Sequence, residues 1–138
     1  MGTKALQFLA MTASRSGEVR GMKWSELHKS ADGDTKQVWI IPKERMKAGK
    51  EHRIPLTPKM IDFLGALPRH KTSDFVFHSE NGIQLSDMTL SAAMKRIHET
   101  DVDNGGVGFI DMTSKRRAVP HGLRSTFRNW AAEYGHDS

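Results

Sequence analysis

Apolar residues at the start of the chain recur with helical spacing. Leu6, Leu9 and Ala13 share one face of a helical wheel, so the first segment is predicted to be a helix that packs on a core. The Ser–Gly pair at residues 16–17 interrupts this pattern. Residues 18–22 are then predicted to form a short second helix.

Three short stretches have the composition of β-strands. Residues 38–41 are β-branched and aromatic and end at Pro42, and residues 52–56 are their expected partner. Because Pro55 has no backbone N–H to donate, this partner is expected at a sheet edge or to end there. Residues 75–77 are short and apolar and predict the third strand.

Two capping signals predict two further helices. Thr57 followed by Pro58 is favoured at a helix start, and an apolar stripe follows over residues 60–67. Ser86 is a second good cap, and helical periodicity continues from it to about residue 99. The glycine-rich and basic stretch that follows, residues 101–119, is predicted to be a long loop. The pattern as a whole predicts one α+β domain, mainly α-helical, with a small three-stranded antiparallel sheet.

Composition narrows the classes of partner. The 138 residues carry a net charge of +5 with a pI near 9.7, which favours a polyanionic partner, although an ordinary solvated basic surface is the alternative interpretation. The sequence has no cysteine, and so no disulfide or thiolate metal site. It has no apolar run long enough to span a bilayer and no signal-peptide pattern, so a cytoplasmic protein is expected.

A basic helix face is predicted near the end of the chain. On a helical wheel His121, Arg124 and Arg128 lie within about 60° of one another, opposite an apolar side. The N-terminus of a helix attracts phosphate, and an arginine there can hold two phosphate oxygens in a fork that lysine cannot form. Taken alone, the pattern fits a solvated basic face at least as well.

Three separated segments together resemble the motifs of a known family. These are TASRSGEVRGMKWSEL at residues 12–27, ERMKAGKEHRIPL at residues 44–56 and HGLRSTFRNWAAE at residues 121–133. In this order they resemble tyrosine recombinases of the phage-integrase family, and most closely integrases of the P4 type from prophages and genomic islands. The resemblance implies that residues 1–138 are a partial catalytic domain, truncated at the C-terminus. The N-terminal DNA-binding domains and the segment with the nucleophilic tyrosine are then expected to be absent.

The resemblance also assigns roles to individual side chains. Arg15 and Arg124 are expected to clamp the non-bridging oxygens of the scissile phosphate, and Glu18 to orient active-site groups. Lys47 is expected to act as general acid on the leaving 5′ oxygen, while His121 assists proton transfer or holds the phosphate. Arg20 and Lys50 are the rival assignments for Arg15 and Lys47. Further DNA contacts are expected from basic side chains of the second segment, of the loop at residues 101–119 and of the third segment, namely Arg45, Lys50, Arg53, Lys115, Arg116, Arg117 and Arg128.

The implied function is site-specific recombination of double-stranded DNA, nucleoid-associated and carried out by a homotetramer of the full-length protein. It proceeds through a 3′-phosphotyrosyl intermediate, with no metal and no cofactor. The chain itself is expected to bind DNA without cleaving it, because its only tyrosine, Tyr134, faces away from Arg124 on the helical wheel.

Two alternatives stay open at this point. One is a non-catalytic DNA-binding module that reads the major groove with the helix at residues 85–99. The other is a metal-dependent nuclease, whose carboxylates would be Asp101, Asp103 and Asp111. The three tryptophans, Trp24, Trp39 and Trp130, are expected to pack in the core and not to stack on bases.

Overall fold

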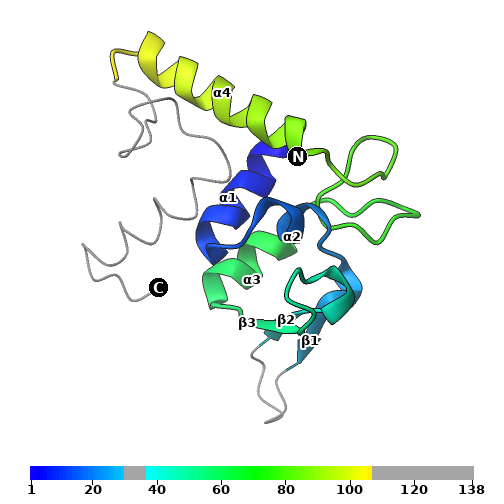
Figure 1. Cartoon of the computed structure of the whole chain (residues 1–138). Coiled ribbons are helices and arrows are strands. Elements are labelled where there is room, and N and C mark those ends of the chain that lie inside the picture. Colours follow the sequence, from blue (N-terminus) through cyan, green and yellow to red (C-terminus); the bar gives the residue numbers. More distant parts are fainter. Residues whose placement is uncertain (30–36, 107–138) are drawn as a thin grey trace, which may run out of the picture.

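A computed structural model describes residues 1–29 and 37–106 (Figure 1). Helices predominate in this part of the chain, and the strands are short. In chain order the elements are α1 (Gly2–Thr12), α2 (Ser16–Arg20), η1 (Trp24–Glu26), β1 (Leu27–Lys29), β2 (Gln37–Ile41), η2 (Lys43–Arg45), β3 (His52–Pro55), α3 (Pro58–Gly65) and α4 (Asp87–Asp103).

Three of the named helices lie between α4 and the sheet. Figure 1 shows α4 along one end and the sheet at the other, with α1, α2 and α3 between them. Helix α4 packs on α1 and α2. At Gly2 the approach of α1 to α4 is close, because a Cβ there would lie 3.2 Å from Thr89 Cγ2 and 3.4 Å from Ala93 Cβ.

Both predicted helix caps are confirmed. The Thr57 side chain accepts a hydrogen bond from the Met60 N–H, and the Ser86 side chain accepts one from the Thr89 N–H, each at 3.2 Å. Helix α4, however, continues to Asp103, so the predicted loop starts too early. The chain offers no helix breaker before Gly105, which has a positive φ of 91° and donates its N–H to the Val102 carbonyl.

The break between the first two helices falls earlier than predicted. Residues 16–17 were expected to interrupt the helical pattern, but both belong to α2. The turn is made instead by Ala13, which adopts the left-handed conformation with φ 53° and ψ 32°. Local propensity marks glycine as the natural breaker, and here an alanine occupies the strained position.

The sheet is a three-stranded antiparallel meander in the order β1-β2-β3. Leu27 pairs with Trp39 across β1 and β2, and Trp39 pairs with Ile54 across β2 and β3. The strand that completes the sheet beside β2 and β3 is therefore β1, and the prediction of a strand at residues 75–77 is wrong. Phe75 forms only an isolated bridge with Lys23.

Burial explains why residues 75–77 resemble a strand without joining the sheet. The Val76 N–H bonds to the Met22 carbonyl at 2.9 Å, which ties the segment to the loop before η1. Val76 and Phe77 are fully buried there. A short apolar run satisfies the same sequence pattern whether it pairs in a sheet or fills a core.

Phe8 of α1 lies at the centre of the core. Its ring contacts the rings of Trp39, Phe63 and Phe77, with centroids 5.6, 6.0 and 5.7 Å away. Phe8, Trp39 and Phe77 are all fully buried, so the core role predicted for Trp39 is confirmed. This cluster joins α1 to β2. Helix α1 leads into α2, and β2 leads into the β2–β3 connection.

Candidate active site

Arg15 occupies the N-cap position of α2. Its backbone is extended, with φ −84° and ψ 153°, and its side chain is exposed. The Glu18 carboxylate accepts a hydrogen bond from the Arg15 N–H at 3.1 Å. Glu18 therefore fixes the backbone from which the Arg15 side chain departs, as the acidic member of a capping box does.

Arg20, the rival to Arg15, is held within the protein. Its Nε donates to Ser16 Oγ at 3.0 Å, and its Nη1 donates to the Leu85 carbonyl at 3.1 Å. The Asp87 carboxylate lies 4.0 Å from Nε. Arg20 thus ties α2 to the start of α4, which leaves Arg15 as the better candidate for a phosphate ligand.

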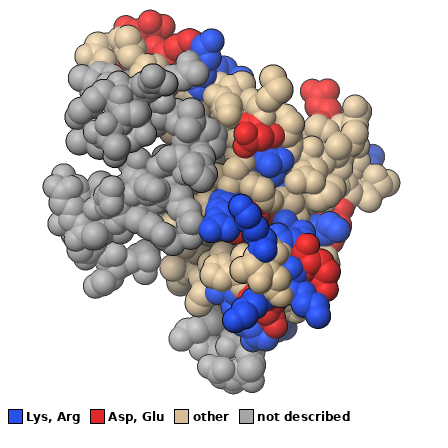
Figure 2. Space-filling model, viewed as in Figure 1, with Lys and Arg blue, Asp and Glu red and all other residues tan. Residues whose placement is uncertain are grey.

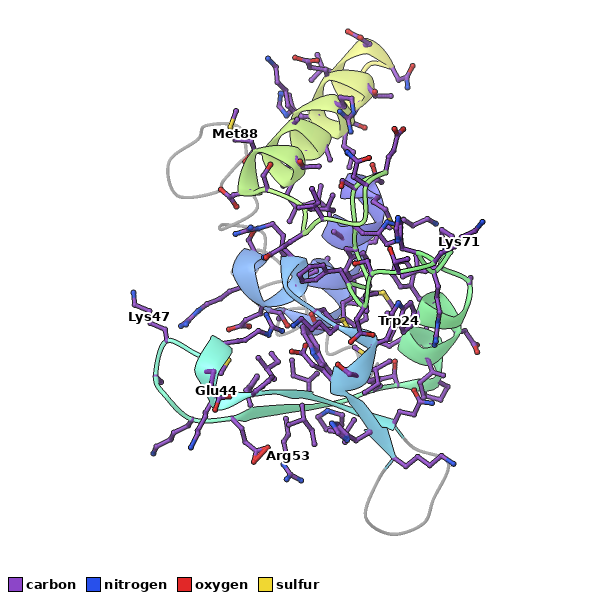
Figure 3. The ribbon with its side chains drawn as sticks, turned by 90° about the vertical axis from the view of Figure 1, so that its right-hand side faces the viewer. Trp24, Glu44, Lys47, Arg53, Lys71 and Met88 are labelled. Atoms are coloured by element: carbon purple, nitrogen blue, oxygen red, sulfur yellow. The ribbon has the colours of Figure 1, made fainter. Side chains whose placement is uncertain are left out.

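Lys47 lies in the connection between β2 and β3. The turn after η2 closes through a 3.0 Å bond from the Gly49 N–H to the Met46 carbonyl, and Gly49 has a positive φ of 72°. Lys47 and its rival Lys50 are both exposed. Figure 3 shows Lys47 projecting outward from this connection, whereas Arg53 projects from β3.

Arg45 differs from the other basic residues of this connection. Its Nε and Nη2 donate to the two carboxylate oxygens of Glu26, each at 2.8 Å, and Nη2 also donates to the Glu18 carbonyl at 3.3 Å. The guanidinium is therefore used in contacts inside the domain. A role of Arg45 in DNA binding stays an untested prediction.

Glu26 is a functional candidate that sequence reasoning missed. It is only 5% exposed and accepts further hydrogen bonds from Trp39 Nε1 and the Lys23 N–H, both at 3.1 Å. The available signal was a carboxylate between Trp24 and Leu27, two apolar residues that pack against the core, because a charge buried there must be paired. That signal could not name the partner.

Exposed charge gathers around the hairpin that β2, the β2–β3 connection and β3 form. Figure 2 shows Lys and Arg side chains clustered over the part of this face that contains the sheet, with acidic side chains among them. Arg53 forms an ion pair with Glu51 at 3.4 Å, in which both side chains are about half exposed or more. Screening by water makes such a pair weak, so Arg53 can exchange Glu51 for another anion.

The third segment of the candidate site lies outside the described residues. Whether Arg15 and Lys47 converge with Arg124 on one phosphate is therefore a prediction. The same holds for the other candidates that lie outside the described residues, namely Lys115, Arg116, Arg117, His121 and Arg128, and for the predicted environments of Trp130 and Tyr134.

Trp24 is half-buried and does not present a free ring. The Arg69 guanidinium lies over it, 4.1 Å from the ring centroid. Within residues 1–29 and 37–106 no three histidine or acidic side chains are grouped so that they could hold a metal ion. In the same ranges, no helix has the length and apolar character needed to cross a membrane.

The sequence and this geometry place the chain in a family. Residues 3–138 match the model of the phage integrase family, and the chain belongs to that family. Among individual relatives, prophage integrase IntA of Escherichia coli (strain K12) is 28% identical over 129 residues. The match covers 91% of this chain and 26% of IntA, so the chain spans about a quarter of this curated relative.

Solved structures confirm the predicted fold. The XerH site-specific recombinase, in a pre-cleavage complex with its difH substrate, superposes with a TM-score of 0.65 at 19% identity. That match covers 97% of this chain and 36% of XerH. The Tn1549 transposon integrase, in complex with circular intermediate DNA, gives a TM-score of 0.64 at 15% identity, over 97% of this chain and 46% of that one. The α+β fold is that of the tyrosine recombinase catalytic domain.

Proposed function

We propose that this chain is part of the catalytic domain of a prophage-type integrase, a site-specific recombinase of double-stranded DNA. The observation that carries the proposal is the way two candidate catalytic segments meet on one helix. Arg15 is the N-cap of α2 and an exposed cation, and Glu18 accepts a hydrogen bond from its backbone N–H. The hairpin that carries Lys47 is bonded to the same helix, through Arg45 and the Glu18 carbonyl.

In the proposed reaction a tyrosine of the full-length recombinase attacks the scissile phosphorus. A 3′-phosphotyrosyl bond forms while the bond from phosphorus to the 5′ oxygen breaks. Arg15 and Arg124 stabilise charge on the non-bridging oxygens, which is the main task of a protein in phosphoryl transfer. Lys47 gives its proton to the leaving 5′ oxygen, and His121 holds the phosphate or accepts the hydroxyl proton that the attacking tyrosine loses. The phosphotyrosyl bond conserves the energy needed for religation.

We propose that the chain as it stands binds duplex DNA and does not cleave it. Its only tyrosine is Tyr134, ten positions after Arg124, and on a helical wheel it lies on the apolar side with Phe127 and Trp130. A nucleophile must reach in-line geometry with the phosphate. The full-length recombinase is expected to assemble as a homotetramer on DNA.

The test of the catalytic proposal is strand cleavage by the full-length recombinase on a nicked duplex that traps the covalent intermediate. Arg15→Lys keeps the charge but loses the fork, so adduct formation is expected to fall by about a hundredfold or more while DNA affinity stays nearly constant. Lys95→Ala on α4 is the control. Equal cleavage by Arg15→Lys and the parent protein would overturn the role of Arg15, whereas no adduct from the parent protein would favour a non-catalytic DNA-binding module.

A further inference from the structure

The base of the β2–β3 connection is anchored by a buried ion pair. Arg45 holds both carboxylate oxygens of Glu26 at 2.8 Å, and the two side chains are 21% and 6% exposed. Trp39 Nε1 and the Lys23 N–H donate to the same carboxylate. Four hydrogen bonds from η2, β2 and the loop before η1 thus converge on one side chain, which leaves it a single orientation.

The guanidinium also fits against the end of α2. Arg45 Nη2 bonds to the Glu18 carbonyl. A Cβ built on Gly21 would collide with Arg45 Nη1, so a residue with a side chain at this position would displace the arginine. Gly21 is therefore the cradle that lets Arg45 reach both Glu26 and the helix.

A gain in stability alone does not explain the buried ion pair of Glu26 and Arg45. A buried ion pair must recover a large desolvation cost, and well-packed apolar residues often do as well or better in its place. What the pair supplies here is a fixed spatial relation between two segments. One is α2, whose first residue follows Arg15, and the other is the hairpin, whose residues 47–51 are exposed to solvent.

We propose that Glu26 and Arg45 are positioning residues that hold Lys47 in place relative to Arg15. Lys47 is two residues from Arg45, so the two Cα atoms are at most about 7 Å apart. Clamping the guanidinium therefore confines the lysine backbone while its side chain stays free to reach a phosphate. The inference rests on the proposed function, in which Lys47 is the general acid.

The test uses the double variant Glu26→Gln with Arg45→Met, called the clamp variant, which removes the ion pair without leaving a buried charge. Glu26→Gln keeps an acceptor for Trp39 and Lys23, and Arg45→Met keeps an apolar stem, so the double variant is expected to fold. The matched control is Glu99→Gln with Lys95→Met, which removes an exposed ion pair of 3.9 Å on α4.

The readout is cleavage by the full-length recombinase of two substrates that differ at one atom, the bridging 5′ oxygen or a sulfur in its place. A thiolate leaves without a proton, because thiols are far more acidic than alcohols. Loss of a general acid therefore slows only the oxygen substrate. We expect the clamp variant to cleave that substrate at least about tenfold more slowly, and to cleave the sulfur substrate at the parent rate. The control is expected to match the parent on both.

Equal losses on both substrates would overturn the positioning role, because a general structural defect does not distinguish leaving groups. Lys47→Ala separates this failure from that of the proposed function. If sulfur rescues Lys47→Ala but not the clamp variant, only the positioning role fails. If sulfur does not rescue Lys47→Ala, the general-acid assignment fails.

A second measurement tests the positioning directly. The chain has no cysteine, so spin labels can be placed at Gln7→Cys and Ala48→Cys, which are both exposed positions. The distance distribution between the labels is expected to broaden in the clamp variant and to stay unchanged in the α4 control. Equal widths in parent and clamp variant would overturn the proposal whatever the role of Lys47.

Discussion

Two polar side chains are buried in the described part of the chain, and their environments are opposite. Glu26 accepts four hydrogen bonds, whereas Ser14 Oγ, in a residue only 4% exposed, has no hydrogen-bond partner there. A buried polar atom without a partner lowers stability. At the scale of single residues, the candidate site therefore contains one well-paired carboxylate and one unpaired hydroxyl beside Arg15.

Removing the Ser14 hydroxyl is expected to stabilise the protein. Ser14→Ala should raise the free energy of unfolding by up to about 1 kcal/mol, because no hydrogen bond is lost. Thr12→Val is the control, since Thr12 Oγ1 donates to the Phe8 carbonyl at 2.9 Å and its loss should cost about 1 kcal/mol. Urea unfolding of the three proteins measures both changes. A loss of stability in Ser14→Ala comparable to that of the control would contradict the assignment.

Sequence motifs identify candidate residues for this site, but they do not show what each side chain contacts. Arg45, Lys47 and Arg53 are alike in the sequence, as basic residues of the segment at residues 44–56. Only the folded structure shows that the first is bonded to Glu26 and the other two are exposed. The partner, Glu26, lies 19 positions away from Arg45. No spacing rule links such positions, because their contact depends on how η1 and the hairpin pack.

At the scale of elements, local signals predicted the starts of α3 and α4, whereas non-local pairing made the assignment of one strand wrong. The caps at Thr57 and Ser86 act within three residues and were confirmed. Strand β1 is a three-residue segment without a strong strand pattern, and it forms because Leu27 pairs with Trp39. Residues 75–77 have the stronger pattern but lie in the core.

The left-handed turn between α1 and α2 is expected to lower the stability of the protein. Ala13 has a φ of 53°, a conformation that costs an L-residue about 1–2 kcal/mol and glycine much less. Ala13→Gly should therefore raise the free energy of unfolding by about 1 kcal/mol. Ala10→Gly, inside α1, should lower it by a similar ~1 kcal/mol. Thermal unfolding in which both variants lose stability equally would show that the turn is not strained.

At the scale of the whole molecule, a core centred on Phe8 supports a surface with excess positive charge. The net charge of +5 does not by itself specify DNA. The distribution matters more, because exposed basic residues gather around the hairpin (Figure 2). The second motif predicted basic residues at the hairpin, but only the folded chain shows that Arg45 makes its contacts inside the domain.

Duplex DNA binding by the chain should depend steeply on salt through this surface. If Lys50 neutralises one phosphate, Lys50→Ala should flatten the log–log salt dependence of affinity by about 0.9. Lys71→Ala is the control, since Figure 3 shows Lys71 on the opposite side of the molecule from Lys47. Titrations at several salt concentrations give the slopes. Equal slopes for the parent and both variants would place the DNA elsewhere on the domain.

The central claim is that Arg15, Lys47 and Arg124 serve one scissile phosphate. A crystal structure of the full-length recombinase on uncleaved duplex DNA tests it most directly. Both arginines should donate to non-bridging oxygens of the same phosphate at about 2.7–2.9 Å, with the Lys47 ammonium beside the 5′ oxygen. A structure in which Arg15 and Arg124 contact different phosphates, or lie on opposite faces of the domain, would contradict it.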